Sequence, residues 1–484
     1  MKSWIIVCGD YLQEKRAVDL FSGLIKEKID FPVEIISSKE VCQDKLQQEN
    51  LVIIGTKDSN VLINKLIADG KIEKCEKEEE YFIFAGESVF NSQNMMMVIS
   101  GFDTAGVTFG AVDMLNIYLA DKSRDNTYNI VDEKFYEMSF TEKTTSFSRQ
   151  SAPAVKMRAI WTWAHCIYDY QKFFENMMMS KLNTVVMWTD YLPINAKEVV
   201  DSAHSYGIKV FWGFSWGWET DAKLVTEFND ETCRKNWAEN IVKRYEEEFA
   251  PTNADGIYFQ TFTERKDTEI NGKKVALLAT EWVNYISDRL WEKYPDLKIQ
   301  FGLHAISVKE DIGYLKDVNK NMEIVWEDAG AFPFNYYPLT ENFDETVKFA
   351  QEIAHLRGDD DKFGVVLKGM TTLNWLTFKH QTGQYVMGKE TDEFLKKRLK
   401  VKEKSWKYFQ AVWMEKFPYA KCLIDQLAKE KKSNLSVQML VEDGMFECGI
   451  FFPVAILSEM MWDIEVSKEE LIRRVALFPK VKFC

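Results

Sequence analysis

The chain has 484 residues, of which 46% are hydrophobic and 28% are charged. A chain of this length exceeds one ordinary hydrophobic core, so we expect two or more globular domains rather than a disordered protein. The formal net charge of −14 argues against nucleic acid as a partner, because binding to phosphates depends on clustered basic side chains.

The cysteine and histidine patterns give no sign of a metal site or a disulfide scaffold. The eight cysteines form no CxxC pair and the five histidines show no HxxxH or HxH spacing, so we expect free thiols, no metal and no cofactor.

No apolar run reaches the roughly 18 residues that a membrane helix needs. The first ten residues read as a strand rather than a secretory signal, which predicts a cytoplasmic protein, or a secreted one whose signal has been removed. The sequence leaves the oligomeric state open, with a homo-oligomer as one option.

Residues 1–120 alternate strands and helices, which predicts a small α/β domain. The expected elements are strands at 4–8, 33–36, 51–54, 81–84 and 95–99, and helices at 15–28 and 60–68. Residues 99–115 form a turn into a helix, and Gly106 and Gly110 predict that this helix packs closely on the sheet. A phosphate-binding loop is the alternative there, but neither GxGxxG nor GxxxxGK[ST] is present. Residues 121–154 are polar and predict a linker or an edge strand.

Residues 155–484 are predicted to form a (β/α)8 barrel, with a doubly wound open sheet as the alternative. Eight strand-like runs occur, at 157–161, 184–188, 209–212, 257–259, 299–301, 323–326, 365–367 and 437–440. Helical segments separate them at 169–179, 196–206, 233–248 and 276–293. A Lys-rich helical excursion at 385–432 precedes the last strand, and an apolar helix at 452–462 follows it.

Residues that follow the strands of such a barrel converge on one mouth. The run from Asp255 to Glu264 shows the pattern, because an apolar strand leads into Gln260 and then to a carboxylate. Similar polar and aromatic residues follow the other strands. The candidate catalytic residues are Glu264, Glu327, Asp328 and Asp443. The candidate substrate-binding residues are Trp161, Trp163, His165, Trp188, Asp190, Trp216, Gln260, His304, Trp326, Lys368 and Trp375.

Carboxylates on several strands, together with 15 Trp residues, point to glycoside hydrolysis. That reaction needs one protonated carboxyl to donate to the leaving oxygen and a second, ionised carboxyl to attack or to activate water. Indole rings can supply an apolar wall for the acid and a stacking surface for a sugar. We expect Glu264 to be the general acid and Asp328 or Glu327 to be the base or stabiliser, with Asp443 in reserve.

Residues 99–115 resemble the G-x-x-x-G-x-x-Y/F-G turn and helix found in several glycoside hydrolases. In β-hexosaminidases (family 20), O-GlcNAcases (family 84) and α-glucuronidases (families 67 and 115), this element closes a small α/β domain that precedes the barrel. The order of domains is also similar, up to about residue 330. The resemblance implies an exo-acting hydrolase that degrades carbohydrate, with a TIM barrel as its catalytic domain.

The chain departs from these families at two positions. Thr263 precedes Glu264, where families 20 and 84 have a second acid for substrate-assisted catalysis on an N-acetyl sugar. Lys368 follows the seventh strand, where the largest clan of retaining barrels has its nucleophile. The α-glucuronidase pattern fits better, and it implies that Lys368 binds the carboxylate of an acidic sugar. A β-N-acetylhexosaminidase, a non-catalytic carbohydrate-binding protein on a degenerate scaffold, and a lyase or isomerase with Lys368 as base remain alternatives.

Overall fold

The structure is a computed structural model that describes residues 3–28, 33–118, 146–214, 216, 230–327, 343–370, 381–431, 434–441 and 446–484. The chain divides into two compact units. The first comprises Met1–Pro153 with Val466–Val481, and the second comprises Ala154–Glu465 with Lys482–Cys484. We predicted that the C-terminal helices belong to the barrel domain at 155–484. In the structure, Val466–Val481 group with the first unit instead. The same unit holds residues 147–151 of the expected linker, while 119–145 lie outside the described residues.

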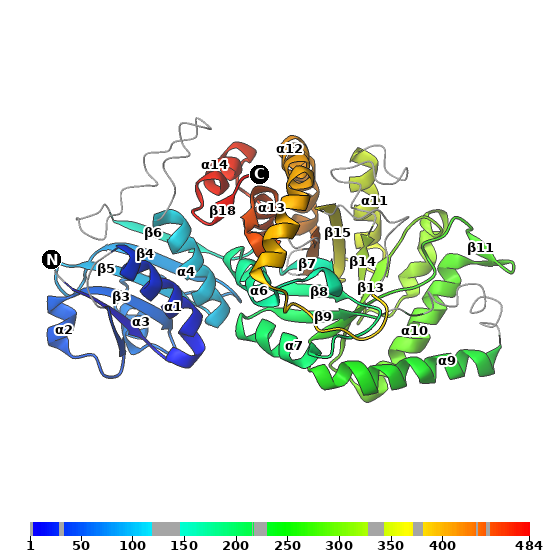
Figure 1. The fold of residues 1–484 in the computed structure, drawn as a ribbon, viewed down its shortest axis with the longest axis horizontal. Coiled ribbons are helices and arrows are strands. Elements are labelled where there is room, and N and C mark those ends of the chain that lie inside the picture. Colours follow the sequence, from blue (N-terminus) through cyan, green and yellow to red (C-terminus); the bar gives the residue numbers. More distant parts are fainter. Residues whose placement is uncertain are drawn as a thin grey trace. The chain divides into compact units, whose positions relative to one another are not determined.

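The first unit is built on a six-stranded sheet in the order β2-β1-β3-β5-β4-β6 (Figure 1). The strands β2, β1, β3 and β5 are parallel, and β4 is antiparallel to both β5 and β6. The strands span Trp4–Cys8 (β1), Glu34–Ser37 (β2), Asn50–Thr56 (β3), Tyr81–Glu87 (β4), Met95–Gly101 (β5) and Phe147–Ser151 (β6). The helices span Tyr11–Lys28 (α1), Gln43–Gln48 (α2), Val61–Ala68 (α3), Thr104–Tyr118 (α4) and Lys468–Leu477 (α14). The predicted alternation is therefore confirmed, although neither α2 nor α14 was predicted.

Asn60 joins two strand ends to the start of α3. Its side chain is fully buried and accepts hydrogen bonds from the backbone N–H groups of Leu62 (3.0 Å) and Ile63 (3.4 Å). The same amide donates to the carbonyl oxygens of Val7 (3.1 Å) and Ile54 (2.9 Å). The cap thus satisfies helix N–H groups and fixes the carboxyl ends of β1 and β3 beside each other.

The helix α4 lies close to the sheet at Gly106 and Gly110, as the sequence predicted. A Cβ atom at Gly106 would overlap the carbonyl oxygen of Glu80, and one at Gly110 would lie 3.0 Å from the Cβ of Tyr81. We expect Gly106→Ala to lower the free energy of unfolding of the first unit by about 1–3 kcal/mol, as overpacking does. Gly23→Ala in α1 is the matched control, because its new Cβ would meet no atom within 4 Å. Equal urea denaturation midpoints for the two variants would contradict the close packing.

The second unit contains a closed barrel of eight parallel strands in the order β7-β8-β9-β10-β13-β14-β15-β16 (Figure 1). The strands span Met157–Trp163 (β7), Thr184–Trp188 (β8), Lys209–Gly213 (β9), Gly256–Gln260 (β10), Lys298–Leu303 (β13), Glu323–Trp326 (β14), Phe363–Met370 (β15) and Leu435–Val441 (β16). Each strand contains one of the eight predicted runs. The TIM barrel is therefore confirmed, and the open doubly wound sheet is excluded.

Helices surround the barrel and connect its strands. They span Tyr170–Met179 (α6), Ala196–Ser205 (α7), Glu231–Arg244 (α9), Val275–Lys293 (α10), Phe343–His355 (α11), Asp392–Lys431 (α12) and Phe452–Trp462 (α13). Short helical turns cover Ala164–Cys166, Tyr245–Phe249, Ala250–Thr252, Lys309–Asp317 and Phe446–Cys448, and the short strands are Glu269–Ile270 (β11), Lys273–Lys274 (β12), Ile450–Phe451 (β17) and Val481–Lys482 (β18). The predicted excursion at 385–432 is helical only from Asp392 onward. Among the described residues, no helix has both the length and the apolar composition required to span a bilayer.

Strand alternation decides which side chains enter the barrel. On β10, Tyr258 and Gln260 share the inner face, while Phe259 stacks on Phe301 outside it. On β14, Glu323 lies at the amino-terminal end of the barrel, where it accepts hydrogen bonds from side chains of β13 and β16. The inner face at the carboxyl ends of the strands is consequently the mouth, where barrel enzymes place their chemistry.

Candidate active site at the mouth of the barrel

Glu327, directly after β14, is a buried carboxylate surrounded by donors. Its Oε1 accepts a hydrogen bond from the Tyr258 hydroxyl at 2.6 Å and another from the Gln260 amide. Its Oε2 lies 3.0 Å from His304 Nε2 and 3.6 Å from Lys368 Nζ. The side chain is only 3% exposed. Three strands, β10, β13 and β15, therefore bring one polar residue or more to the carboxylate that follows β14.

These donors set the protonation state of Glu327. Burial alone would raise its pKa, but the charge and hydrogen bond of His304, the Lys368 ammonium and the Tyr258 hydroxyl outweigh burial and hold the pKa well below its ordinary value. Glu327 is therefore an anion at neutral pH. It cannot be the protonated acid of a hydrolytic pair, but it can be the ionised member.

Glu264, after β10, lies near the same histidine. Its Oε2 lies 3.8 Å from His304 Nε2, and its side chain is 33% exposed. Because both contacts involve one nitrogen, the oxygens of Glu264 and Glu327 are separated by no more than the sum of 3.8 and 3.0 Å. Glu264 is thus the accessible carboxyl and Glu327 the enclosed one, and both contact the same imidazole nitrogen.

An aromatic cluster lies on the inner face beside Glu327. Trp161 stacks on Trp188 with ring centroids 6.3 Å apart, and Trp163 meets both rings edge-on at 5.8 Å. Tyr258 completes the cluster, 6.0 Å from Trp161. The three indoles are between 3% and 6% exposed, so they pack mainly against one another. They form an apolar wall that continues through the ring of Tyr258, whose hydroxyl donates a hydrogen bond to Glu327.

Two other predicted tryptophans lie outside the mouth. Trp326 meets Phe349 of α11 edge-on at 5.2 Å, on the outer face of β14. Trp216 stacks on Phe259 at 3.7 Å, and Phe259 likewise faces the helical layer. Both indoles are at most 1% exposed. Each is packed between barrel and helices, and we do not retain either as a sugar-binding surface.

The remaining predicted residues are less closely involved. The ring of His165, in the turn after β7, lies 6.2 Å from the ring of Trp163. Asp190, after β8, is half-buried, and its carbonyl oxygen accepts a hydrogen bond from Arg244. Three predicted residues, Asp328, Trp375 and Asp443, lie outside the described residues. Within the described ranges, no group of three or more His, Cys, Asp and Glu side chains is placed to hold a metal ion.

Three residues with a place at this site were not predicted. Tyr258 could have been found from strand alternation, because it lies two residues before Gln260. Gly302 on β13 lies against the donor pair, and a Cβ there would overlap both Glu327 Oε1 and the Tyr258 hydroxyl. Tyr385 reaches the end of β8 from a distant segment, with its hydroxyl 3.3 Å from Thr189 Oγ1. No local pattern in the sequence indicates that last contact.

Comparisons with known proteins bear on the fold. The sequence matches no protein-family model. No curated protein matches it at a significant level. Among solved structures, a GH138 enzyme targeting pectin rhamnogalacturonan II is 10% identical with a TM-score of 0.50, over 96% of this chain and 51% of that one. The GH20 exo-β-N-acetylglucosaminidase from Vibrio harveyi, in complex with N-acetylglucosamine, is 10% identical with a TM-score of 0.51, over 98% of this chain and 72% of that one.

The chain spans about half the length of the GH138 enzyme that it resembles. At 10% identity the likeness shows the fold and does not transfer an activity. The chain therefore shares its architecture, an α/β unit combined with an eight-stranded parallel barrel, with glycoside hydrolases of families 20 and 138.

Proposed function

We propose that the protein is an exo-acting glycoside hydrolase that uses carboxylates at the mouth of its barrel. The observation that carries the proposal is the position of His304, whose Nε2 contacts Glu327 at 3.0 Å and Glu264 at 3.8 Å. One carboxyl is accessible and the other is buried and ionised, which is the asymmetry that glycoside hydrolysis requires. The fold shared with glycoside hydrolases supports the same reading.

Glu264 is the proposed general acid. It gives its proton to the glycosidic oxygen while the bond from that oxygen to the anomeric carbon breaks. Positive charge then develops on the sugar ring, and the fixed negative charge of Glu327 stabilises it in a site of low dielectric constant. Water adds to the anomeric carbon and loses a proton to a base. We propose Asp328 as that base, with Asp443 in reserve.

The substrate is proposed to be an acidic sugar, as in α-glucuronidases. Lys368 supplies positive charge at the mouth and is 16% exposed, although Glu327 already neutralises part of it. Thr263 stands where an N-acetyl sugar would need a second acid, which weighs against the β-N-acetylhexosaminidase alternative. That alternative is supported by the likeness to the Vibrio harveyi enzyme. Aryl β-N-acetylglucosaminides and aryl α-glucuronides distinguish the two.

The test is hydrolysis of a panel of aryl glycosides by the wild-type protein and by Glu264→Gln. Loss of a general acid slows substrates with poor leaving groups by about 10²–10⁴-fold. Substrates with strongly acidic phenol leaving groups should lose much less, since they depart without a proton. Glu269→Gln, on an exposed strand of the β11–β12 hairpin, is the matched control. Equal loss across all leaving groups would remove Glu264 from the acid role, and a product with a new ultraviolet absorbance would indicate lyase chemistry instead.

A non-catalytic carbohydrate-binding protein is the second candidate, and the surroundings of Glu327 favour it. Both oxygens of that carboxylate are engaged by protein donors, so it cannot also accept a proton from water without rearrangement. Sugar-induced shifts in melting temperature without release of phenol from any substrate in the panel would support this candidate. They would overturn the hydrolase proposal.

Gly302 offers an independent test of the carboxylate pair. The methyl group of Gly302→Ala would displace Glu327 from Tyr258, and we expect turnover to fall by about 10²-fold, as small misplacements of catalytic groups produce. Gly313→Ala is the control, because its Cβ would meet no atom within 4 Å. The two variants should be compared for kcat and for thermal stability. Unchanged kcat in a folded Gly302→Ala protein would show that the Tyr258–Glu327 contact has no part in the reaction.

A further inference from the structure

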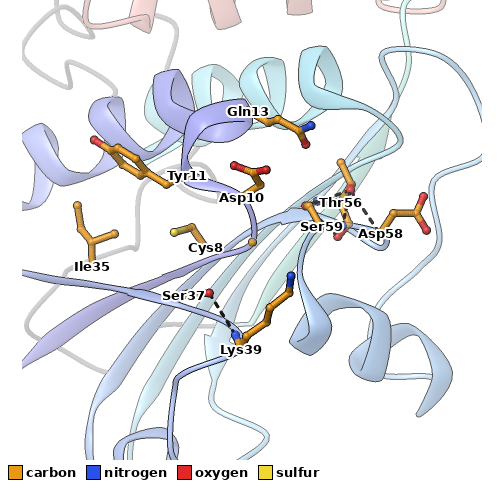
Figure 2. A pocket seen from close by; sticks show the side chains of 11 residues that line it. Cys8, Asp10, Tyr11, Gln13, Ile35, Ser37, Lys39, Thr56, Asp58 and Ser59 are labelled. Carbon is orange, nitrogen blue, oxygen red and sulfur yellow. Dashed lines mark hydrogen bonds between the residues drawn. The ribbon is translucent and has the colours of Figure 1, made fainter.

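The first unit contains a pocket of about 690 Å³ at the carboxyl ends of three neighbouring strands (Figure 2). Its lining comes from the turn after β1, the end of β2 with the residues that follow it, and the turn after β3. The polar residues that enter the argument are Asp10, Ser37, Lys39, Thr56, Asp58 and Ser59. No step of the proposed hydrolysis uses these residues. The volume is in the range of small-molecule sites, which is about 300–1,000 Å³.

The topology of the sheet explains why a pocket forms here. From β1 the chain crosses to β2 on one side, and it then returns to place β3 on the other side of β1. The connections that follow β1 and β3 therefore run toward opposite edges of the sheet. In open α/β sheets, such a switch point at the carboxyl ends of the strands is where ligands bind.

The floor of the pocket is fixed by a buried carboxylate. Glu14 of α1 is 1% exposed and accepts hydrogen bonds from the backbone N–H of Gly9 (3.0 Å) and from the Ser59 hydroxyl. The Ser59 hydroxyl also accepts from the N–H of Thr56 at 2.9 Å. A Cβ at Gly9 would overlap the Ser59 carbonyl oxygen, so the two turns touch. These contacts hold the turns after β1 and β3 in place at the base of the pocket.

Two opposite charges, Asp10 and Lys39, lie above this floor. Figure 2 shows the Lys39 side chain extending from the residues after β2 toward the turn that carries Asp10. Asp10 Oδ1 accepts the N–H of Leu12, but within the described part of the chain no ion pair involves either Asp10 or Lys39. Asp58 also lines the pocket, which makes the lining net acidic. Ile35, which is 40% exposed, adds an apolar edge.

We propose that this pocket is a second ligand site of the protein, for a neutral polyhydroxylated molecule of monosaccharide size. A pair of adjacent hydroxyls can donate to Asp10 and accept from Lys39 at once, while the Ser37 hydroxyl, which accepts the N–H of Lys39, can donate to a further ligand oxygen. Charge-assisted hydrogen bonds of this kind are the stronger ones. The net acidic lining disfavours a phosphate or an acidic sugar. The site therefore differs in ligand chemistry from the barrel mouth, and it does not depend on the activity proposed there.

The experiment is methyl-resolved NMR of the full chain with ¹³C-labelled isoleucine methyl groups. The Ile35 methyl reports on the pocket, and Ile35→Val assigns its signal. D-Galactose, D-glucose and N-acetylglucosamine are titrated to tens of millimolar, with D-glucuronate, inorganic phosphate and glycine as probes of other chemistry. We expect saturable movement of the Ile35 signal with a neutral sugar, while the signals of Ile63 and Ile67 in α3 stay in place.

Two substitutions localise the effect. Lys39→Met and Asp10→Asn should each weaken the neutral-sugar response by about tenfold or more, the cost of losing a charged hydrogen bond. Lys65→Met and Asp69→Asn, at the exposed end of α3, are the matched controls and should leave it unchanged. Glu264→Gln should also leave it unchanged, which separates this site from the barrel mouth. No movement with any neutral sugar, movement only with phosphate, glucuronate or glycine, or movement that survives both pocket variants would overturn the proposal.

Discussion

Replacing Glu327 with glutamine is expected to reduce turnover of every hydrolysed substrate by about 10³-fold or more, whatever its leaving group. The reason is that the substitution removes a buried negative charge which His304, Lys368 and Tyr258 hold in place. The oxocarbenium-like transition state loses its stabilising anion, and protonation of the leaving oxygen cannot compensate. The measurement is kcat on aryl glycosides that span a range of leaving-group acidity.

Glu323→Gln is the matched control for this prediction. Glu323 begins β14, the strand that Glu327 follows, and it lies on the same inner face at the opposite end of the barrel, where Gln300 and Ser436 donate to it. Burial raises the pKa of Glu323, whereas the donors around Glu327 lower its pKa. Burial favours the neutral, protonated form of Glu323, and a glutamine amide is also neutral. Glu323→Gln should therefore retain wild-type turnover. Similar losses in both variants would mean that Glu327 acts through barrel stability rather than through its charge.

Lys181→Met is expected to lower the free energy of unfolding of the barrel unit by about 3–5 kcal/mol. Lys181 Nζ lies 2.8 Å from Glu459 Oε1, and the two side chains are 1% and 6% exposed. The ammonium also lies 4.5 Å from the ring centroid of Trp462. Methionine would fill much of the volume, but it would leave the Glu459 carboxylate buried without its counter-charge.

The exposed pair of Lys197 and Asp201 provides the comparison. Its nitrogen and oxygen are 3.1 Å apart, yet the side chains are 64% and 55% exposed. Solvent screens such pairs, so Lys197→Met should change the free energy of unfolding by at most about 0.5 kcal/mol. Chemical denaturation followed by tryptophan fluorescence measures both. A double variant, Lys181→Met with Glu459→Met, should recover most of the loss, and a double variant as unstable as the single one would show that packing rather than charge is responsible.

The strands of the barrel were predictable because each is a short apolar run that ends in polar residues. The same feature brought Glu264, Gln260, His304, Glu327 and Lys368 into one candidate set, and the structure places all five in contact around one histidine and one carboxylate. Position after a strand, however, does not say which face a side chain occupies. If Glu327 points inward, its neighbour Trp326 must point outward, so the two residues cannot both line the mouth.

Contacts between distant segments were not predictable from local patterns. Tyr385 lies in a stretch whose composition suggested helix, yet its segment pairs with the residues after β8. Asn195 makes two hydrogen bonds to the backbone of Met387, donating to the carbonyl oxygen at 3.0 Å and accepting from the N–H at 2.9 Å. Such a segment has no amphipathic repeat of its own. Its conformation is fixed by partners almost two hundred positions earlier in the chain.

The membership of Val466–Val481 in the first unit has a consequence for biosynthesis. A ribosome makes the six strands of the small sheet early, but it releases α14 only after the entire barrel has been translated. The first unit therefore has all of its residues available only after a much larger neighbour has been synthesised.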